Sequence, residues 1–340
     1  MIEITRDKHL AEEILFIDGS WGTGKSILGP VLGSFDRVEK QKIDHIFEYV
    51  ATLDYLGKIQ RDAAKSLLGM YADIDLFNSL ISREVNLRWN DDSGILNNPK
   101  AFSYIKRLFM SDGDIIKSRI GNERPILQIM SHHLLHVADS IFDTFGNRVK
   151  FVEMVRHPVY MVSHWYNYLH RVGADEREFN IWLKGNNQTL PWFIENETEF
   201  NELNRMDRVI YSLSKLDAML DSSIQKHREN ILVIPFELFV TDPNPFVTSI
   251  QTFLNAKPTS ALSKVLRRQK VPRKVLSAGR GHKSYGWSEK EIENSDVADY
   301  QSRLDFVAAN ATPIWVDRLL KLGAKYQATY KVAGIGPWAT

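Results

Sequence analysis

ILFIDGSWGTGKS, residues 14–26, is the stretch of sequence that decides the fold of this chain. A short apolar run stands directly before Gly19, and the next residues as far as Ser26 fit the pattern G-x-x-x-x-G-K-S. The pattern predicts a strand, a phosphate-binding loop and a helix. Its glycines let the backbone turn tightly and point successive N–H groups inward, and its lysine adds a mobile cation. We therefore expect a nucleotide's phosphate or sulfate group to be held by Gly22, Thr23, Gly24, Lys25 and Ser26.

The composition is that of a globular protein with balanced charge. The chain has 340 residues, of which 44% are hydrophobic and 25% charged. This size suits one large α/β domain or two closely joined ones, and the absence of repeats and linkers favours a single domain over residues 1–340. A formal net charge of +1 argues against broad nucleic-acid binding. Because the chain has no cysteine, disulfides, thiolate metal sites and cysteine nucleophiles are excluded.

The beginning of the chain is charged and has no apolar signal core, and no apolar run approaches the length of about 18 residues that a membrane span needs. We therefore expect a cytoplasmic protein without a membrane span.

Four apolar runs of strand length recur along the chain, with helical segments between them: 14–18, 125–130, 149–155 and 231–235. Such runs, joined by long crossovers, predict a parallel sheet covered on both faces. The fold class is therefore α/β, a P-loop-type three-layer fold with a central parallel sheet and helices on both faces. Residues from about 40 to 114 show helical spacing without a convincing strand and predict a helical insertion. Residues from about 173 to 204 predict a loop-and-helix cover.

Arg156 stands at the end of the third run and is followed by Pro158, which fits the first turn of a helix. An arginine at the end of a buried strand is placed to grip a phosphate with two parallel hydrogen bonds. A surface arginine before a solvated helix start is the alternative. Ser163 lies on the same predicted helix.

These motifs, in this order, resemble the sulfotransferases that use 3′-phosphoadenosine 5′-phosphosulfate (PAPS). The resemblance extends to the segment 125–134, which contains His132 and His133, to the segment 231–243, and to Arg280-Gly281-His282-Lys283-Ser284-Tyr285-Gly286-Trp287. It implies that the first loop binds the 5′-phosphosulfate and that Arg156 and Ser163 bind the 3′-phosphate. It further makes Arg280 and Lys283 candidates for the C-terminal loop that reaches this phosphate. Arg156 and Ser163 are one residue closer together than is usual in the family, which leaves open whether Ser163 or His164 makes the contact.

The resemblance implies an enzyme that moves a sulfuryl group from PAPS, its co-substrate, to a hydroxyl or amine of an unidentified acceptor. Lys25 would stabilise the developing negative charge, and His132 or His133 would remove the acceptor proton. A purely structural role of both histidines is the alternative. A metal site at His132, His133 and His136 would lack the glutamate of H-E-x-x-H and a fourth ligand, so we expect none.

A P-loop kinase or NTPase that uses ATP or GTP with Mg²⁺ is the competing class, and the Gly-Lys-Ser ending of the loop favours it. That class needs Ser26 and a carboxylate at the end of another apolar strand to hold the ion. The run 149–155 ends in Arg156, and the run 231–235 offers only Glu237. This pattern favours the sulfotransferase. A nucleotide-binding protein without catalysis is the third hypothesis.

Overall fold

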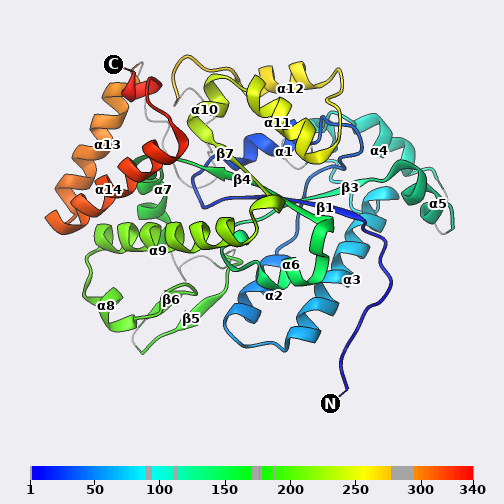
Figure 1. The fold of residues 1–340 in the computed structure, drawn as a ribbon, viewed down its shortest axis with the longest axis horizontal. Coiled ribbons are helices and arrows are strands. Elements are labelled where there is room, and N and C mark those ends of the chain that lie inside the picture. Colours follow the sequence, from blue (N-terminus) through cyan, green and yellow to red (C-terminus); the bar gives the residue numbers. More distant parts are fainter. Residues whose placement is uncertain are drawn as a thin grey trace.

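The computed structural model describes residues 2–339 except 89–93, 111–113, 171–175, 177, 187 and 277–294. Its centre is a five-stranded sheet in the order β2-β3-β1-β4-β7, in which every pairing is parallel (Figure 1). The strands are β1 (Glu13–Asp18), β2 (Lys42–Ile43), β3 (Ile126–Met130), β4 (Val149–Val155) and β7 (Ile231–Pro235).

The four predicted strands are confirmed as β1, β3, β4 and β7. They lie at the centre and one side of the sheet, where near-continuous burial selects apolar residues at every position. β2 was missed. The expectation of no strand between residues 40 and 114 is wrong at this edge of the sheet, where two residues of β2 pair with Ile129 and Met130. A strand of two residues is too short to show a hydrophobic period.

Alternate residues of the strands pack on opposite faces of the sheet. Ile14 and Phe16 of β1 belong to one core cluster, and Leu15 and Ile17 belong to another. The first cluster lies under α2 (Ile46–Tyr55), α3 (Arg61–Leu80) and α6 (Asp139–Phe145), and the second under α1 (Leu28–Leu32), α10 (Phe236–Thr241), α11 (Asn244–Leu254) and α12 (Leu262–Arg268) (Figure 1). The helix–sheet–helix layers of the predicted α/β fold are therefore present.

A third core cluster joins helices at the end of the sheet near β7 and β4. It gathers around the fully buried Trp165 of α7, and it includes residues of α9, α13 and α14 as well as Phe200. These helices are α7 (Pro158–His170), α9 (Arg205–Lys226), α13 (Asp296–Asn310) and α14 (Pro313–Tyr330) (Figure 1). α7 begins at Pro158, as the sequence predicts, since the fixed φ of proline suits a first helical position.

The two segments set apart by the sequence have distinct structures. Between residues 40 and 114 the described chain is helical after β2 and includes α4 (Ala101–Arg107), and α5 (Asp114–Glu123) follows. The loop-and-helix description of the cover is incomplete, because β5 (Trp182–Lys184) and β6 (Thr189–Pro191) form an antiparallel pair before α8 (Glu197–Glu202). The single-domain division of the chain stays a prediction. No helix in the described part of the chain is long and apolar enough to cross a membrane.

Candidate functional site

The predicted phosphate loop connects the end of β1 to a short 3-10 turn, Lys25–Ile27, which continues into α1. Gly22 and Gly24 have φ angles of 87° and 85°, in the left-handed region that glycine adopts without strain. A Cβ atom on Gly24 would also lie 2.5 Å from the ring of Phe236. The loop therefore needs glycine for its conformation and for its close packing against α10.

Lys25 is buried beneath the loop, where its Nζ donates a hydrogen bond to the carbonyl oxygen of Gly19 at 2.9 Å. Burial lowers the pKa of Lys25 to about 8, although the nearby acidic groups, first Asp18 and then Glu48, act to raise it. Thr23 is also buried, and its hydroxyl donates to the carbonyl oxygen of Ser20 at 2.9 Å. Ser26 is exposed. The lysine thus places a positive charge close to the loop backbone.

Two carboxyl groups lie side by side at the ends of β1 and β4, where Asp18 is the register partner of Glu153. Asp18 accepts hydrogen bonds from Ser131 Oγ at 3.0 Å and from the backbone N–H of Leu135 at 2.7 Å. Neither carboxyl oxygen of Glu153 has a hydrogen-bond partner among the described residues. Burial, reinforced by the charge of Asp18, raises the pKa of Glu153 well above its usual range, which favours its protonated form.

His132 is held by Glu48 of α2. Glu48 Oε1 accepts from the His132 backbone N–H at 2.9 Å and lies 3.3 Å from His132 Nδ1. The other oxygen, Oε2, lies 3.2 Å from Nδ1 of His45. Burial opposes ionisation of Glu48, but its bonds to the two histidines outweigh burial and lower its pKa to about 2. The ionised carboxylate thus turns Nδ1 of His132 toward itself and leaves Nε2 as the nitrogen that can accept a proton.

The second candidate base, His133, has a different environment. Its φ is 57°, its side chain is 3% exposed, and neither ring nitrogen has a hydrogen-bond partner among the described residues. The ring packs edge-on against Trp21 and Trp165, with centroids 4.5 and 5.6 Å apart. Burial lowers the pKa of His133 well below 6.5. The geometry favours His132 over His133 as the base.

His136, the third residue of the metal alternative, is also buried, and burial lowers its pKa to about 3. In the described residues no three His, Cys, Asp or Glu side chains come together in a way that could hold a metal ion.

Arg156 reaches the loop from the end of β4. Its Nη1 donates to the carbonyl oxygen of Gly22 at 3.0 Å, and its guanidinium lies over the Phe236 ring, 4.2 Å from the centroid. Its Nε is buried and has no acceptor in the described part of the protein. Burial lowers the pKa of Arg156, opposed by the charge of Glu237. The contacts with Gly22 and Phe236 therefore place a half-buried cation beside the loop.

Two arginines that the sequence did not indicate lie on the same rings. Arg273 is 5.5 Å from the centroid of Phe236, and Arg303 is 5.1 Å from that of Tyr160, which Arg156 also contacts. Burial, followed by the charge of Arg156, lowers the pKa of Arg273 to about 10. This concentration of positive charge adjoins the loop. No motif marks Arg273 or Arg303, because the fold alone brings them to Arg156.

The remaining predicted site residues are placed less decisively. His164 of α7 lies against the loop, since a Cβ atom on Gly22 would be 3.3 Å from the Cβ of His164. Ser163 is half-buried on the same helix. The contact of either residue with a 3′-phosphate stays a prediction. Arg280 and Lys283 lie outside the described residues.

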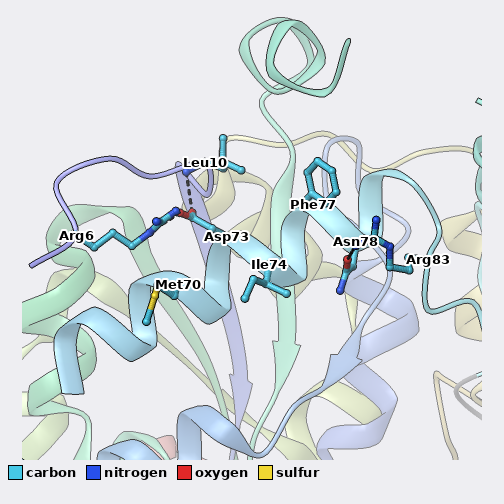
Figure 2. Close-up of a pocket in the computed structure, with 8 residues that line it drawn as sticks. All are labelled: Arg6, Leu10, Met70, Asp73, Ile74, Phe77, Asn78 and Arg83. Atoms are coloured by element: carbon cyan, nitrogen blue, oxygen red, sulfur yellow. Dashed lines mark hydrogen bonds and ion pairs between the residues drawn. The ribbon is translucent and has the colours of Figure 1, made fainter. Parts of the chain in front are cut away.

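Two hollows in the described part of the surface lie away from these residues. Figure 2 shows one between the N-terminal segment and α3, where Arg6 and the backbone of Leu10 are held by Asp73. Its floor is formed by apolar side chains of α3, including Ile74 and Phe77. None of the predicted site residues lines it.

Comparison with known proteins gives structural neighbours alone. No family model matches the chain, and no curated protein matches its sequence. Similar solved structures include the sulfotransferase domain of the Synechococcus PCC 7002 olefin synthase, which is 14% identical with a TM-score of 0.42, over 96% of this chain and 98% of that one. The sulfotransferase domain of the curacin biosynthetic pathway is 13% identical, with a TM-score of 0.42, over 88% of this chain and 99% of that one.

A third is sulfotransferase STF9 from Mycobacterium avium, 11% identical with a TM-score of 0.44, over 94% of this chain and 77% of that one. These neighbours carry the family name that the sequence motifs resemble. At such identities and TM-scores the likeness carries no argument about function, which has to rest on the site itself.

Proposed function

We propose that the chain is a sulfotransferase that moves the sulfuryl group of PAPS to a hydroxyl or amine of an acceptor. The loop and Lys25 would hold the 5′-phosphosulfate, and Arg156 would bind the 3′-phosphate. His132, oriented by Glu48, would act as the general base.

In this mechanism the acceptor oxygen or nitrogen attacks the sulfur in line. The new bond to sulfur forms as the bond from sulfur to the 5′-phosphate oxygen breaks, and 3′,5′-adenosine bisphosphate leaves. The acceptor proton passes to Nε2 of His132. Negative charge grows on the leaving oxygen and on the sulfonate, where Lys25 and the loop N–H groups lower its energy. Positioning and fixed cations therefore supply most of the catalysis, as in phosphoryl transfer.

The guanidinium of Arg156, half-buried beside the loop and held by the Gly22 carbonyl and the Phe236 ring, is the observation that carries the proposal. A nucleotide with phosphate at the 5′ position alone is held by the loop and leaves this cation without an anionic partner. A nucleotide with a second phosphate at the 3′ position offers it a charged acceptor, and such bonds contribute roughly 1.5–3 kcal/mol.

The kinase alternative gains no such support from the described residues. Mg²⁺ is usually held through at least one ionised carboxylate, and burial raises the pKa of Glu153, which opposes ionisation of the carboxyl beside Asp18.

Calorimetry tests the proposal through the affinities for 3′,5′-adenosine bisphosphate and ADP. We expect the bisphosphate to bind about 10-fold to 100-fold more tightly, and Arg156→Ala to abolish most of this preference. Arg37→Ala is the matched control, since that arginine lies at the opposite end of the sheet with its donors satisfied by Glu13, Arg124 and Asn255. Equal affinities of the unmodified protein for the two nucleotides would contradict the proposal.

Radiolabelled donors test the reaction itself. We expect sulfate label to move from PAPS into acceptors of a mixed extract in excess EDTA. Transfer from γ-labelled ATP that requires Mg²⁺, with none from PAPS, would establish the kinase instead.

A further inference from the structure

One carboxylate, Glu48, joins two histidines from different parts of the sequence. His45 immediately precedes α2, and His132 follows β3. Each turns Nδ1 toward a different oxygen of Glu48, at 3.2 Å for His45 and 3.3 Å for His132. The two rings are nearly parallel, with centroids 6.4 Å apart and planes inclined by 23°. At this separation two imidazolium charges repel each other strongly enough to disfavour double protonation.

The surroundings of the two rings differ in charge. His132 faces the ammonium of Lys25, which disfavours an added positive charge on this ring. His45 faces Asp44, which favours one. The other titratable neighbours are His133 beside His132, Asp18, which interacts with Glu48, and Tyr49, whose ring stacks on His45 at 5.9 Å. A single proton shared by this group therefore resides on His45.

We propose that His45 is a positioning residue: it holds the second oxygen of Glu48 and, when it carries a proton, keeps His132 in the neutral form that can accept one. The proposal rests on the function proposed above, because it assigns His132 the role of base. It adds a residue that touches neither nucleotide nor acceptor and acts through Glu48.

The directions of the pKa shifts agree with this geometry. The hydrogen bond to Glu48 raises the pKa of His45 above 6.5, against the effect of burial. Burial, followed by the charge of Lys25, lowers the pKa of His132 below 6.5, although Glu48 acts to raise it. Between these two pKa values His45 is charged and His132 is neutral.

Removing the imidazole of His45 should change the pKa of His132 in a defined direction. In His45→Asn the negative charge of Glu48 acts on His132 without the opposing positive charge. The pKa of His132 then rises, by about 0.5–1 pH unit for a unit charge at this distance in a partly exposed site. The acid limb of the turnover profile moves to higher pH by the same amount, because a larger fraction of His132 is protonated at a given pH. A role of His45 in packing alone would lower turnover at every pH without moving this limb.

The experiment follows the imidazole resonances of the full chain by NMR during a pH titration, together with sulfuryl transfer over the same pH range. The matched control is His9→Asn, because His9 contacts Glu12 with the same three-residue spacing at a distant, exposed site. We expect the titration of His132 to move upward in His45→Asn and to stay unchanged in His9→Asn. A second variant, Glu48→Gln, removes the shared carboxylate and lowers the titration midpoint of His45.

An unchanged His132 titration in His45→Asn overturns the inference even if the chain transfers sulfate. A shifted titration in a chain that transfers no sulfate supports the coupling of the two histidines and refutes the proposed function instead. The two failures are thus distinguishable, since the NMR titration does not need turnover.

Discussion

Lys25 and Lys150 lie at opposite ends of the central sheet and share several properties. Each donates a hydrogen bond to a backbone carbonyl, that of Gly19 for Lys25 and that of Phe253 for Lys150. Burial lowers the pKa of both. Their neighbours differ, because Lys25 lies in a phosphate-type loop whose Gly22 carbonyl also accepts a hydrogen bond from Arg156.

At the other end of the sheet the cations bond to the protein itself. Arg37 pairs with Glu13 and donates to the carbonyl oxygens of Arg124 and Asn255, and Arg148 donates to that of Ala11. This end also contains a hollow lined by these arginines. The presence of a hollow is therefore not enough to locate an anion site, since cations that are already bonded to the protein gain little from a ligand.

The largest expected effect concerns the base at the loop end of the sheet. His132→Ala should lower turnover about 10²-fold to 10⁴-fold with nearly unchanged affinity for the donor, because proton transfer is lost and nucleotide contacts are kept. Steady-state kinetics with PAPS and calorimetry with 3′,5′-adenosine bisphosphate measure the two quantities.

His133→Ala is the matched control for this change. It removes a neighbouring buried imidazole that packs on Trp21, so it should lower the free energy of unfolding while turnover per folded molecule changes little. A larger loss of turnover in His133→Ala than in His132→Ala would reverse the assignment of the base.

The second prediction tests directly whether Lys25 and Lys150 differ in function. Lys25→Ala should weaken nucleotide binding and lower turnover about 10²-fold to 10³-fold, as expected when a donor to the developing charge is removed. Lys150→Ala should leave both quantities unchanged within about twofold, because its side chain bonds to the backbone far from the loop. Equal losses in the two variants, measured by calorimetry and initial rates, would show that the loop end has no special role.

Much of the fold could be predicted because strands that are buried on both faces of the sheet are continuous apolar runs in the sequence. β1, β3, β4 and β7 are runs of apolar residues, and the loop after β1 has a pattern tied to its conformation. β2 has two residues, and the β5–β6 pair has strands of three residues. Such short strands depend on their partners more than on their own sequence, so a hydrophobic period in the sequence does not predict them.

The candidate site could be predicted only where a residue belongs to a strand end or to the loop. Lys25, Arg156 and His132 meet that condition, and their functional roles stay predictions. Glu48 was missed because it belongs to a helix that carries no motif, and only the packing of α2 brings it to His132. Its one signal was a charged residue among the apolar positions of that helix.

The smallest expected effect on turnover concerns Glu153, a buried acidic residue to which we assign no function. Glu153 has the same loop-end location as Lys25, but its carboxyl has no hydrogen-bond partner in the described residues, and burial raises its pKa well above 4.5, which favours the protonated form. Glu153→Gln places a neutral group of similar shape at this position. Turnover at pH 7 should therefore stay within about twofold of that of the unmodified chain.

The Glu153→Gln variant should differ from the unmodified chain in how its stability depends on pH. In the unfolded chain Glu153 ionises near its ordinary pKa of 4.5, whereas burial in the folded chain raises this pKa. Folding then takes up a proton, and its contribution to stability falls by up to about 1.4 kcal/mol per pH unit as pH rises from the ordinary toward the raised pKa. Glu153→Gln lacks this loss. Chemical denaturation at pH 5.5, 6.5 and 7.5 should show the variant gaining stability relative to the unmodified chain at each step. Parallel pH dependences would mean that Glu153 is ionised in the fold, and this carboxylate beside Asp18 would then restore the case for a cation at the loop end of the sheet.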